Sequence, residues 1–102
     1  MIIVTGSVRA RAETIDDVVA LALEHVERSR REPGCVLHSV HRDVEDPLRL
    51  VFLEHWADKA SLAAHFAVPA SAEFVAQASG LADGSPTLEM YEATPIDVAD
   101  LR

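Results

Sequence analysis

The sequence contains very little cysteine. Cys35 is the only one, so no disulfide can form within the chain, and a reducing compartment is the simplest setting. A single cysteine without signs of activation is most often a small buried apolar residue rather than a nucleophile. The opening residues "MIIVTG" lack the basic start and the long apolar stretch of a secretory signal. We therefore expect a cytoplasmic protein.

Basic residues and long apolar runs are also scarce. Nine Lys and Arg against 17 Asp and Glu give a net charge of −8. This balance argues against nucleic acid or an anionic membrane as a partner, because no basic surface is available for phosphates. No segment is long and apolar enough to span a membrane.

Patterns that bind cofactors and metals are missing as well. The chain has no Gly-rich phosphate loop, no nucleophile elbow and no paired cysteines for zinc. His38 and His41 are three residues apart on a predicted strand, so their side chains point to opposite faces, and His55 lies opposite Trp56 and Glu54. We therefore expect the histidines not to converge, and we predict no metal site and no cofactor.

What remains is a short apolar chain. With 102 residues and 49% hydrophobic content, residues 1–102 are expected to form a single domain, with a C-terminal tail from about residue 95 to 102. A domain of this size buries only about 60–65% of the surface of its unfolded chain, so pairing with a second copy is an economical way to enlarge the core.

The pattern of apolar residues and turn signals predicts alternating strands and helices. Thr14 with Asp17, and Asp58 before the second helix, have the spacing of N-terminal caps. The expected strands are residues 1–11, 35–45, 48–57 and 87–94, and the expected helices are residues 14–31, 59–66 and 70–79. This order predicts an α+β fold, the ferredoxin-like βαββαβ arrangement, with an antiparallel sheet and the helices on one face.

The third predicted strand is apolar on both faces. Leu48, Leu50, Phe52 and Trp56 share one side, and Val51 and Leu53 the other, whereas a strand with one solvated face alternates with polar residues. We therefore predict a homodimer in which a second sheet covers the open face.

The stretch "REPGCVLHSVHRDVEDPLRLVFLEHWADKASLAAHF" resembles the antibiotic biosynthesis monooxygenase family. The shared features are Glu-Pro-Gly-Cys before a strand, an Asp-Pro turn, and Glu-x-Trp-x-Asp-x-x-Ala-x-x-x-His. The resemblance implies a dimeric α+β barrel with a pocket in each subunit between sheet and helices. Similar enzymes add oxygen from O2 to electron-rich phenols, hydroquinones or anthrones without metal, flavin or haem.

Two departures from relatives matter. Quinol-type members often have a second His after the Pro that follows the helix, where this chain has Ala70 after Pro69. Haem-degrading relatives have a proximal His in the next helix, where this chain is apolar around Val75. The second departure argues against haem.

The candidate site residues each have two interpretations. His65 is either an ordinary residue of a helix end or a hydrogen-bonding group and general base, since its unperturbed pKa lies near neutrality. Trp56 is either a core aromatic or a pocket wall that stacks on a flat ligand. Glu54 is a structural hydrogen-bond acceptor or orients substrate, and the structural role is favoured. Weaker candidates for the apolar lining are Phe52, Phe66, Phe74, Met90 and Tyr91.

The sequence thus favours a cofactor-independent monooxygenase with catalytic His65. Its partners would be a small aromatic substrate, O2 and a second copy of the chain. The spacing of Trp56 and His65 predicts that both border one cavity while barely touching. The alternative is a non-catalytic dimeric barrel that binds a small apolar ligand or serves a structural role. A polar group that replaces the missing second His would discriminate the two, and Ser71 and Gln77 are the nearby candidates.

Overall fold

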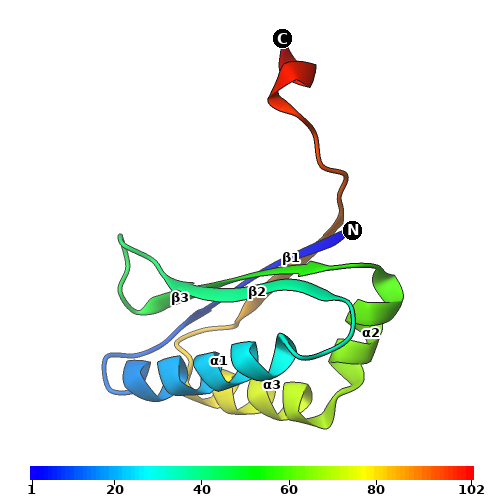
Figure 1. Cartoon of the computed structure of the whole chain (residues 1–102). Helices are drawn as coiled ribbons and strands as arrows, with labels where there is room; N and C mark the ends of the chain where they lie inside the picture. The colour runs from blue at the N-terminus through cyan, green and yellow to red at the C-terminus, as the bar shows by residue number, and fades with distance from the viewer.

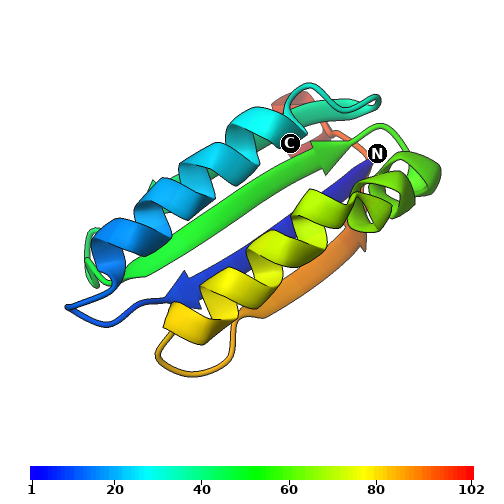
Figure 2. The ribbon, with the colours of Figure 1, turned by 90° about the horizontal axis from the view of Figure 1, so that it is seen from below.

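The computed structural model describes residues 1–102 and has the predicted ferredoxin-like α+β order (Figure 1). The elements are β1 (Ile2–Arg9), α1 (Ile15–Ser29), β2 (Cys35–Arg42), β3 (Arg49–Trp56), α2 (Lys59–Ala67), α3 (Pro69–Leu81), β4 (Thr87–Glu92) and a terminal 3-10 turn η1 (Val98–Leu101). The strands form one antiparallel sheet in the order β2-β3-β1-β4. The helices cover one face of it, and α1 and α3 lie side by side along the strands (Figure 2).

The two faces of β3 differ in burial. Leu50, Phe52, Glu54 and Trp56 point to the helices and are buried, while the residues between them are half-buried on the open face. Apolar residues on the helix side form two separate clusters. One contains Leu50 and Phe52 with residues of β1 and α1, and the other contains Trp56 with residues of β1 and α2. Glu54 lies between them on β3, so a polar layer divides the core.

Of the two predicted helix caps, one is confirmed and one is wrong. The Asp58 carboxylate accepts a hydrogen bond from the Ser61 backbone N–H at 2.8 Å, as expected at the start of α2. Thr14 precedes α1, but its side chain makes no capping bond. Its hydroxyl instead donates to the backbone carbonyl of Leu81 at 2.8 Å. The hydroxyl thus ties the start of α1 to the end of α3.

Most element boundaries differ from the prediction by one or a few residues, and for two of them the structure shows the cause. β2 ends at Arg42 rather than at residue 45, because the Asp43 side chain accepts a hydrogen bond from the Glu45 N–H at 2.8 Å and turns the chain. α3 begins at Pro69 itself, since a proline at the first helical position loses no intrahelical bond.

The chain after β4 leaves the body of the protein. Residues beyond Glu92 extend away on the side of the sheet opposite the helices (Figure 1). Ile96, Val98 and Leu101 are largely exposed along this tail. None of the helices has the length and apolar character needed to cross a membrane.

Candidate active site

A cavity of about 370 Å³ lies between the sheet and the helices. Its walls are mostly apolar and include Phe52 from β3, Phe66 from α2 and Phe74 from α3. At one end three buried side chains, His25, Glu54 and His65, supply polar atoms. The volume lies within the range of about 300–1,000 Å³ that is usual for small-molecule sites.

The structure places five of the predicted site residues in the wall of this cavity. They come from one strand and two helices, and they are Phe52 and Glu54 on β3, His65 and Phe66 on α2, and Phe74 on α3. His65 is buried rather than exposed at the end of its helix. The position of these side chains permits the roles that we predicted for them.

Trp56 does not line the cavity, which corrects the prediction that it forms a wall. Its side chain has 0% exposure, and its ring centroid lies 4.6 Å from that of His65. The two rings therefore pack directly against each other, and the predicted gap between them is wrong. Trp56 is a core residue that packs against the ring of His65 and does not itself line the cavity.

Met90 and Tyr91 are also outside the cavity wall. Both lie on the edge strand β4 and are about half exposed. Tyr91 pairs with Ile3 in the sheet register, which directs its ring to the open face, where its hydroxyl donates to Glu89. The predicted lining role is therefore wrong for both residues, because the cavity reaches β4 only at Thr87 and Leu88.

Glu54 is the centre of the polar layer. Its Oε1 accepts a hydrogen bond from the indole Nε1–H of Trp56 at 2.9 Å. Nε2 of His38 lies 3.3 Å from the same oxygen, and Nε2 of His65 lies 3.9 Å from it. Burial raises the pKa of Glu54, but the contact with His38 and the bond from Trp56 outweigh this and hold the pKa below its usual value. Glu54 is therefore a buried carboxylate at neutral pH.

His65 is oriented by a second carboxylate. Its Nδ1 lies 2.9 Å from Oε1 of Glu32, in the loop after α1. A carboxylate only accepts hydrogen bonds, so the neutral ring has its proton on Nδ1. The lone pair of Nε2 is then free on the side of Glu54 and the cavity. This is the tautomer that a general base facing the cavity needs.

The position of Glu32 depends on the tight turn that follows it. Gly34 has a φ of 81°, a conformation that glycine adopts without steric cost. A Cβ atom at this position would lie 2.0 Å from the Ser61 hydroxyl. The turn therefore brings the end of α1 close against the start of α2, and Glu32 reaches His65.

His25 is a site residue that the sequence analysis missed. Its ring stacks on Phe74, with centroids 4.2 Å apart and planes at 7°, and its Nδ1 lies 2.7 Å from Nη2 of Arg28. Burial, followed by the neighbouring His38 and His65, lowers its pKa to about 3, so the ring is neutral at ordinary pH. Its position could have been found in the sequence, because it shares the buried face of α1 with Val18.

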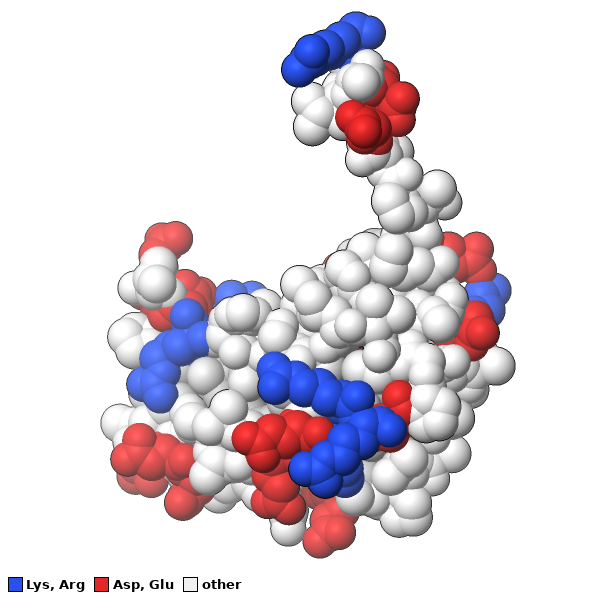
Figure 3. Space-filling model, in the orientation of Figure 1, with Lys and Arg blue, Asp and Glu red and all other residues white.

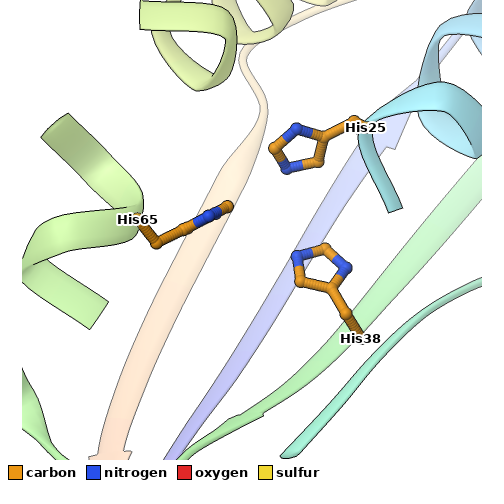
Figure 4. A group of neighbouring side chains, drawn as sticks. All are labelled: His25, His38 and His65. Atoms are coloured by element: carbon orange, nitrogen blue, oxygen red, sulfur yellow. The ribbon is translucent and has the colours of Figure 1, made fainter. Parts of the chain in front are cut away.

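The prediction that His38 points away from His41 and His55 is confirmed, but the wider expectation that the histidines do not converge is wrong. His25, His38 and His65 face one another (Figure 4), with one ring nitrogen of each within 4.8 Å of the others. Zinc bonds of about 2.0–2.1 Å in tetrahedral geometry would require these nitrogens to approach to about 3.4 Å. The guanidinium of Arg28 only donates, so Nδ1 of His25 accepts and the proton lies on Nε2. A metal at this point would have to displace that proton.

Ser71 supplies the polar group sought near the missing second histidine. It is buried in the cavity wall on α3, and its hydroxyl has no hydrogen-bond partner in the protein. Gln77 is exposed on the same helix and does not line this cavity. An unpartnered buried hydroxyl is costly unless something bonds it, so Ser71 is suited to contact a ligand.

Known proteins resemble this chain in both sequence and structure. The model of the antibiotic biosynthesis monooxygenase family matches residues 1–77. The uncharacterized protein sll1783 of Synechocystis sp. is 30% identical over 91 residues, which are 89% of this chain and 62% of that protein. The chain thus spans less than two thirds of the length of that relative.

Solved structures match over nearly their whole length. A crystal structure of an antibiotic biosynthesis monooxygenase has a TM-score of 0.86 and 32% identity, over 93% of this chain and 100% of that one. A Deinococcus radiodurans protein described as a candidate member of the same group has a TM-score of 0.90 and 26% identity, over 95% and 96%. The family match covers most of the chain and the structures share its fold. The chain therefore belongs to the antibiotic biosynthesis monooxygenase family.

Proposed function

We propose that this protein is a cofactor-independent monooxygenase that acts on an electron-rich phenol, hydroquinone or anthrone with O2. The observation that carries the proposal is the placement of His65, with a free Nε2, at the polar end of an otherwise apolar cavity. A flat aromatic substrate fits between the phenylalanine side chains, and its hydroxyl points to the histidine.

The first step is the removal of a proton. His65 takes the proton of the substrate O–H on Nε2, and the O–H bonding pair stays on the substrate oxygen. Glu32 at Nδ1 and Glu54 beside Nε2 are then negative charges on either side of the imidazolium. They stabilise it most in the form that it reaches after proton transfer. The neutral phenol becomes an electron-rich phenolate.

The substrate then supplies all the electrons. The phenolate gives one electron to O2, and the radical and superoxide recombine with formation of a C–O bond. Loss of water from the resulting peroxide leaves one oxygen atom as a carbonyl and releases the other as water. In an anthrone a CH2 group thus becomes C=O, and in a phenol or hydroquinone a ring C–H becomes a quinone C=O. In each case four electrons pass from the substrate to O2, and no external reductant is needed. The apolar wall keeps water out and holds the radical pair together.

A second copy of the chain is the partner that we propose for the open sheet face. Ile3, Leu37, Val51 and Leu53 give this face an apolar surface, with side chains half-buried or exposed in the single chain. Figure 3 shows that charged side chains gather over α1 and that the surface between the sheet and the tail has few. Sheet-to-sheet packing of two copies would cover this surface.

The proposed activity is tested by oxygen consumption. Wild-type protein is incubated with a panel of hydroquinones and anthrones in an oxygen electrode, and the product is analysed by mass spectrometry after reaction under 18O2. We expect one labelled oxygen atom in the product and one in water, without added metal or flavin. Tight binding of the same compounds without oxygen consumption would instead support the ligand-binding barrel.

A further inference from the structure

His25 has a ring nitrogen that the protein leaves without a partner. The only hydrogen bond of its ring joins Nδ1 to Arg28. The other nitrogen, Nε2, faces His65 and His38 (Figure 4). His25 also lines the cavity. Because Arg28 can only donate, Nε2 carries the proton of the neutral ring and is a hydrogen-bond donor directed at the site.

His65 has the opposite polarity at the same end of the cavity. Its Nδ1–H donates to Glu32, and no protein donor bonds its Nε2. The converging nitrogens of His25 and His65 lie within 4.8 Å of each other. An oxygen atom that makes hydrogen bonds of about 2.9 Å can contact both nitrogens at once. The cavity thus presents one donor and one acceptor to a single oxygen atom.

We propose that His25 binds the reacting oxygen of the substrate, donating its Nε2–H to the phenolate that forms when His65 takes the proton. This inference rests on the proposed function, since it assumes a phenolic substrate. The step breaks the phenol O–H bond and forms N–H on His65, while His25 keeps its own proton throughout. His25 is then a catalytic residue, because it touches the reacting atom, and Arg28 is a positioning residue that fixes its tautomer.

The surroundings of His25 fit a neutral donor rather than a second base. Its pKa of about 3, caused first by burial, keeps it from competing for the substrate proton. Four groups face it from other elements: His38 on β2, Glu54 on β3, His65 on α2 and Phe74 on α3. The stack on Phe74 fixes the plane of the ring. A donor held in this way requires little reorganisation when charge develops on the substrate.

The test uses 4-nitrophenol, whose ionisation is visible by absorbance. We expect wild-type protein to bind the phenolate more tightly than the phenol and so to lower the pH at which the bound probe ionises. His25→Leu should reduce the ionisation constant of the bound probe by about ten- to a hundredfold, the usual effect of losing a hydrogen bond to a charged group. His25→Gln, which keeps an N–H near the position of Nε2, should restore part of the effect.

Arg28 gives an independent test through the tautomer. Nitrogen-15 NMR of wild-type protein should show His25 protonated on Nε2, and Arg28→Met should shift part of the population to Nδ1 and weaken the effect on the probe. Arg28→Lys, which keeps a charged donor, should behave more like wild type. Arg31→Met is the matched control, because Arg31 is exposed just after α1 and bonds no ring. It should change neither signal.

Three results would overturn the inference. The first is that the probe ionises at the same pH on wild type and on His25→Leu. The second is that wild-type His25 has its proton on Nδ1. The third is tight one-to-one binding of Co²⁺, because this metal needs the lone pair of Nε2. The test is separable from that of the proposed function. A His25-dependent shift of the probe without oxygen consumption would reject the monooxygenase alone. Oxygen consumption with no such shift would reject the role of His25 alone.

Discussion

Glu32 and His65 are 33 positions apart in the chain, yet Oε1 of Glu32 lies 2.9 Å from Nδ1 of His65. The turn at Gly34 brings them together. This contact decides which nitrogen of His65 is free to act.

Replacing Glu32 by Gln keeps the size of the side chain but removes its charge. The amide oxygen still accepts the bond from Nδ1–H but carries no charge to stabilise an imidazolium. We expect turnover to fall by about 10-fold, because a hydrogen bond to a charged group is stronger by about 1–1.5 kcal/mol than one between neutral groups. The measurement is kcat for oxygen consumption, with Glu27→Gln on the exposed face of α1 as control. Equal kcat in wild type and Glu32→Gln would show that the contact has no part in the reaction.

Trp56 should matter for stability rather than for direct ligand contact. We expect Trp56→Ala to lower the free energy of unfolding by about 3–5 kcal/mol, because it empties a fully buried site. Trp56→Phe keeps most of the packing and should cost about 1–3 kcal/mol, since Glu54 loses its indole donor. Urea unfolding measures both. If Trp56→Phe is as stable as wild type but no longer binds ligand, then Trp56 contacts the ligand directly, contrary to this prediction.

His25 makes the stability of the fold depend on pH. Its pKa is about 3 in the folded protein against 6.5 for the free group. Between these pH values His25 binds a proton in the unfolded chain but not in the folded protein. The free energy of unfolding therefore decreases as the pH falls from about 6.5 towards 3. Glu54, whose pKa is lowered by its contacts, adds a loss of the same sign at the acid end.

The comparison of variants isolates the contribution of His25. The free energy of unfolding of wild type should fall more steeply with acidification than that of His25→Gln, in which this proton is absent. His41→Gln changes an exposed histidine of β2 and serves as control. If the free energy of unfolding depends on pH in the same way in wild type and His25→Gln, then His25 is not a buried neutral ring in the folded protein.

The open sheet face should pair two copies of the chain. We expect light scattering at micromolar concentration to give a dimer with an interface on the order of 2,000 Å² or more. Leu53→Arg places a charge on this face and should give monomers, whereas Leu23→Arg, at an exposed position of α1, should not. A folded wild-type monomer under these conditions would exclude the pairing.

The sequence predicted the fold well because the signals were local. The apolar run of β3, the cap at Asp58 and the proline that starts α3 each indicate an element through nearby residues. The Thr14 cap failed because a distant carbonyl, that of Leu81, competes for the same hydroxyl. Such a contact between two ends of the fold leaves no trace in the spacing of the residues.

The site was predicted in part for the same reason. Phe52 and Glu54 follow from strand periodicity, which places them on the inner face, and His65 follows from the motif that the chain shares with its family. His25 shows the same periodicity on α1 but belongs to no motif, so its position carried no signal of chemistry. The contact between Trp56 and His65 depends on how closely α2 packs on the sheet, and spacing along the chain does not determine that distance.

Replacing His65 tests whether a histidine in the cavity removes the proton of a phenolic substrate. The measurement is kcat for oxygen consumption by wild type, His65→Gln and the control His41→Gln, with a hydroquinone or anthrone that wild type oxidises. We expect His65→Gln to lose roughly 10²-fold, the usual effect of losing a general base. His41→Gln should match wild type. A folded His65→Gln protein with wild-type kcat would show that His65 does not remove the substrate proton.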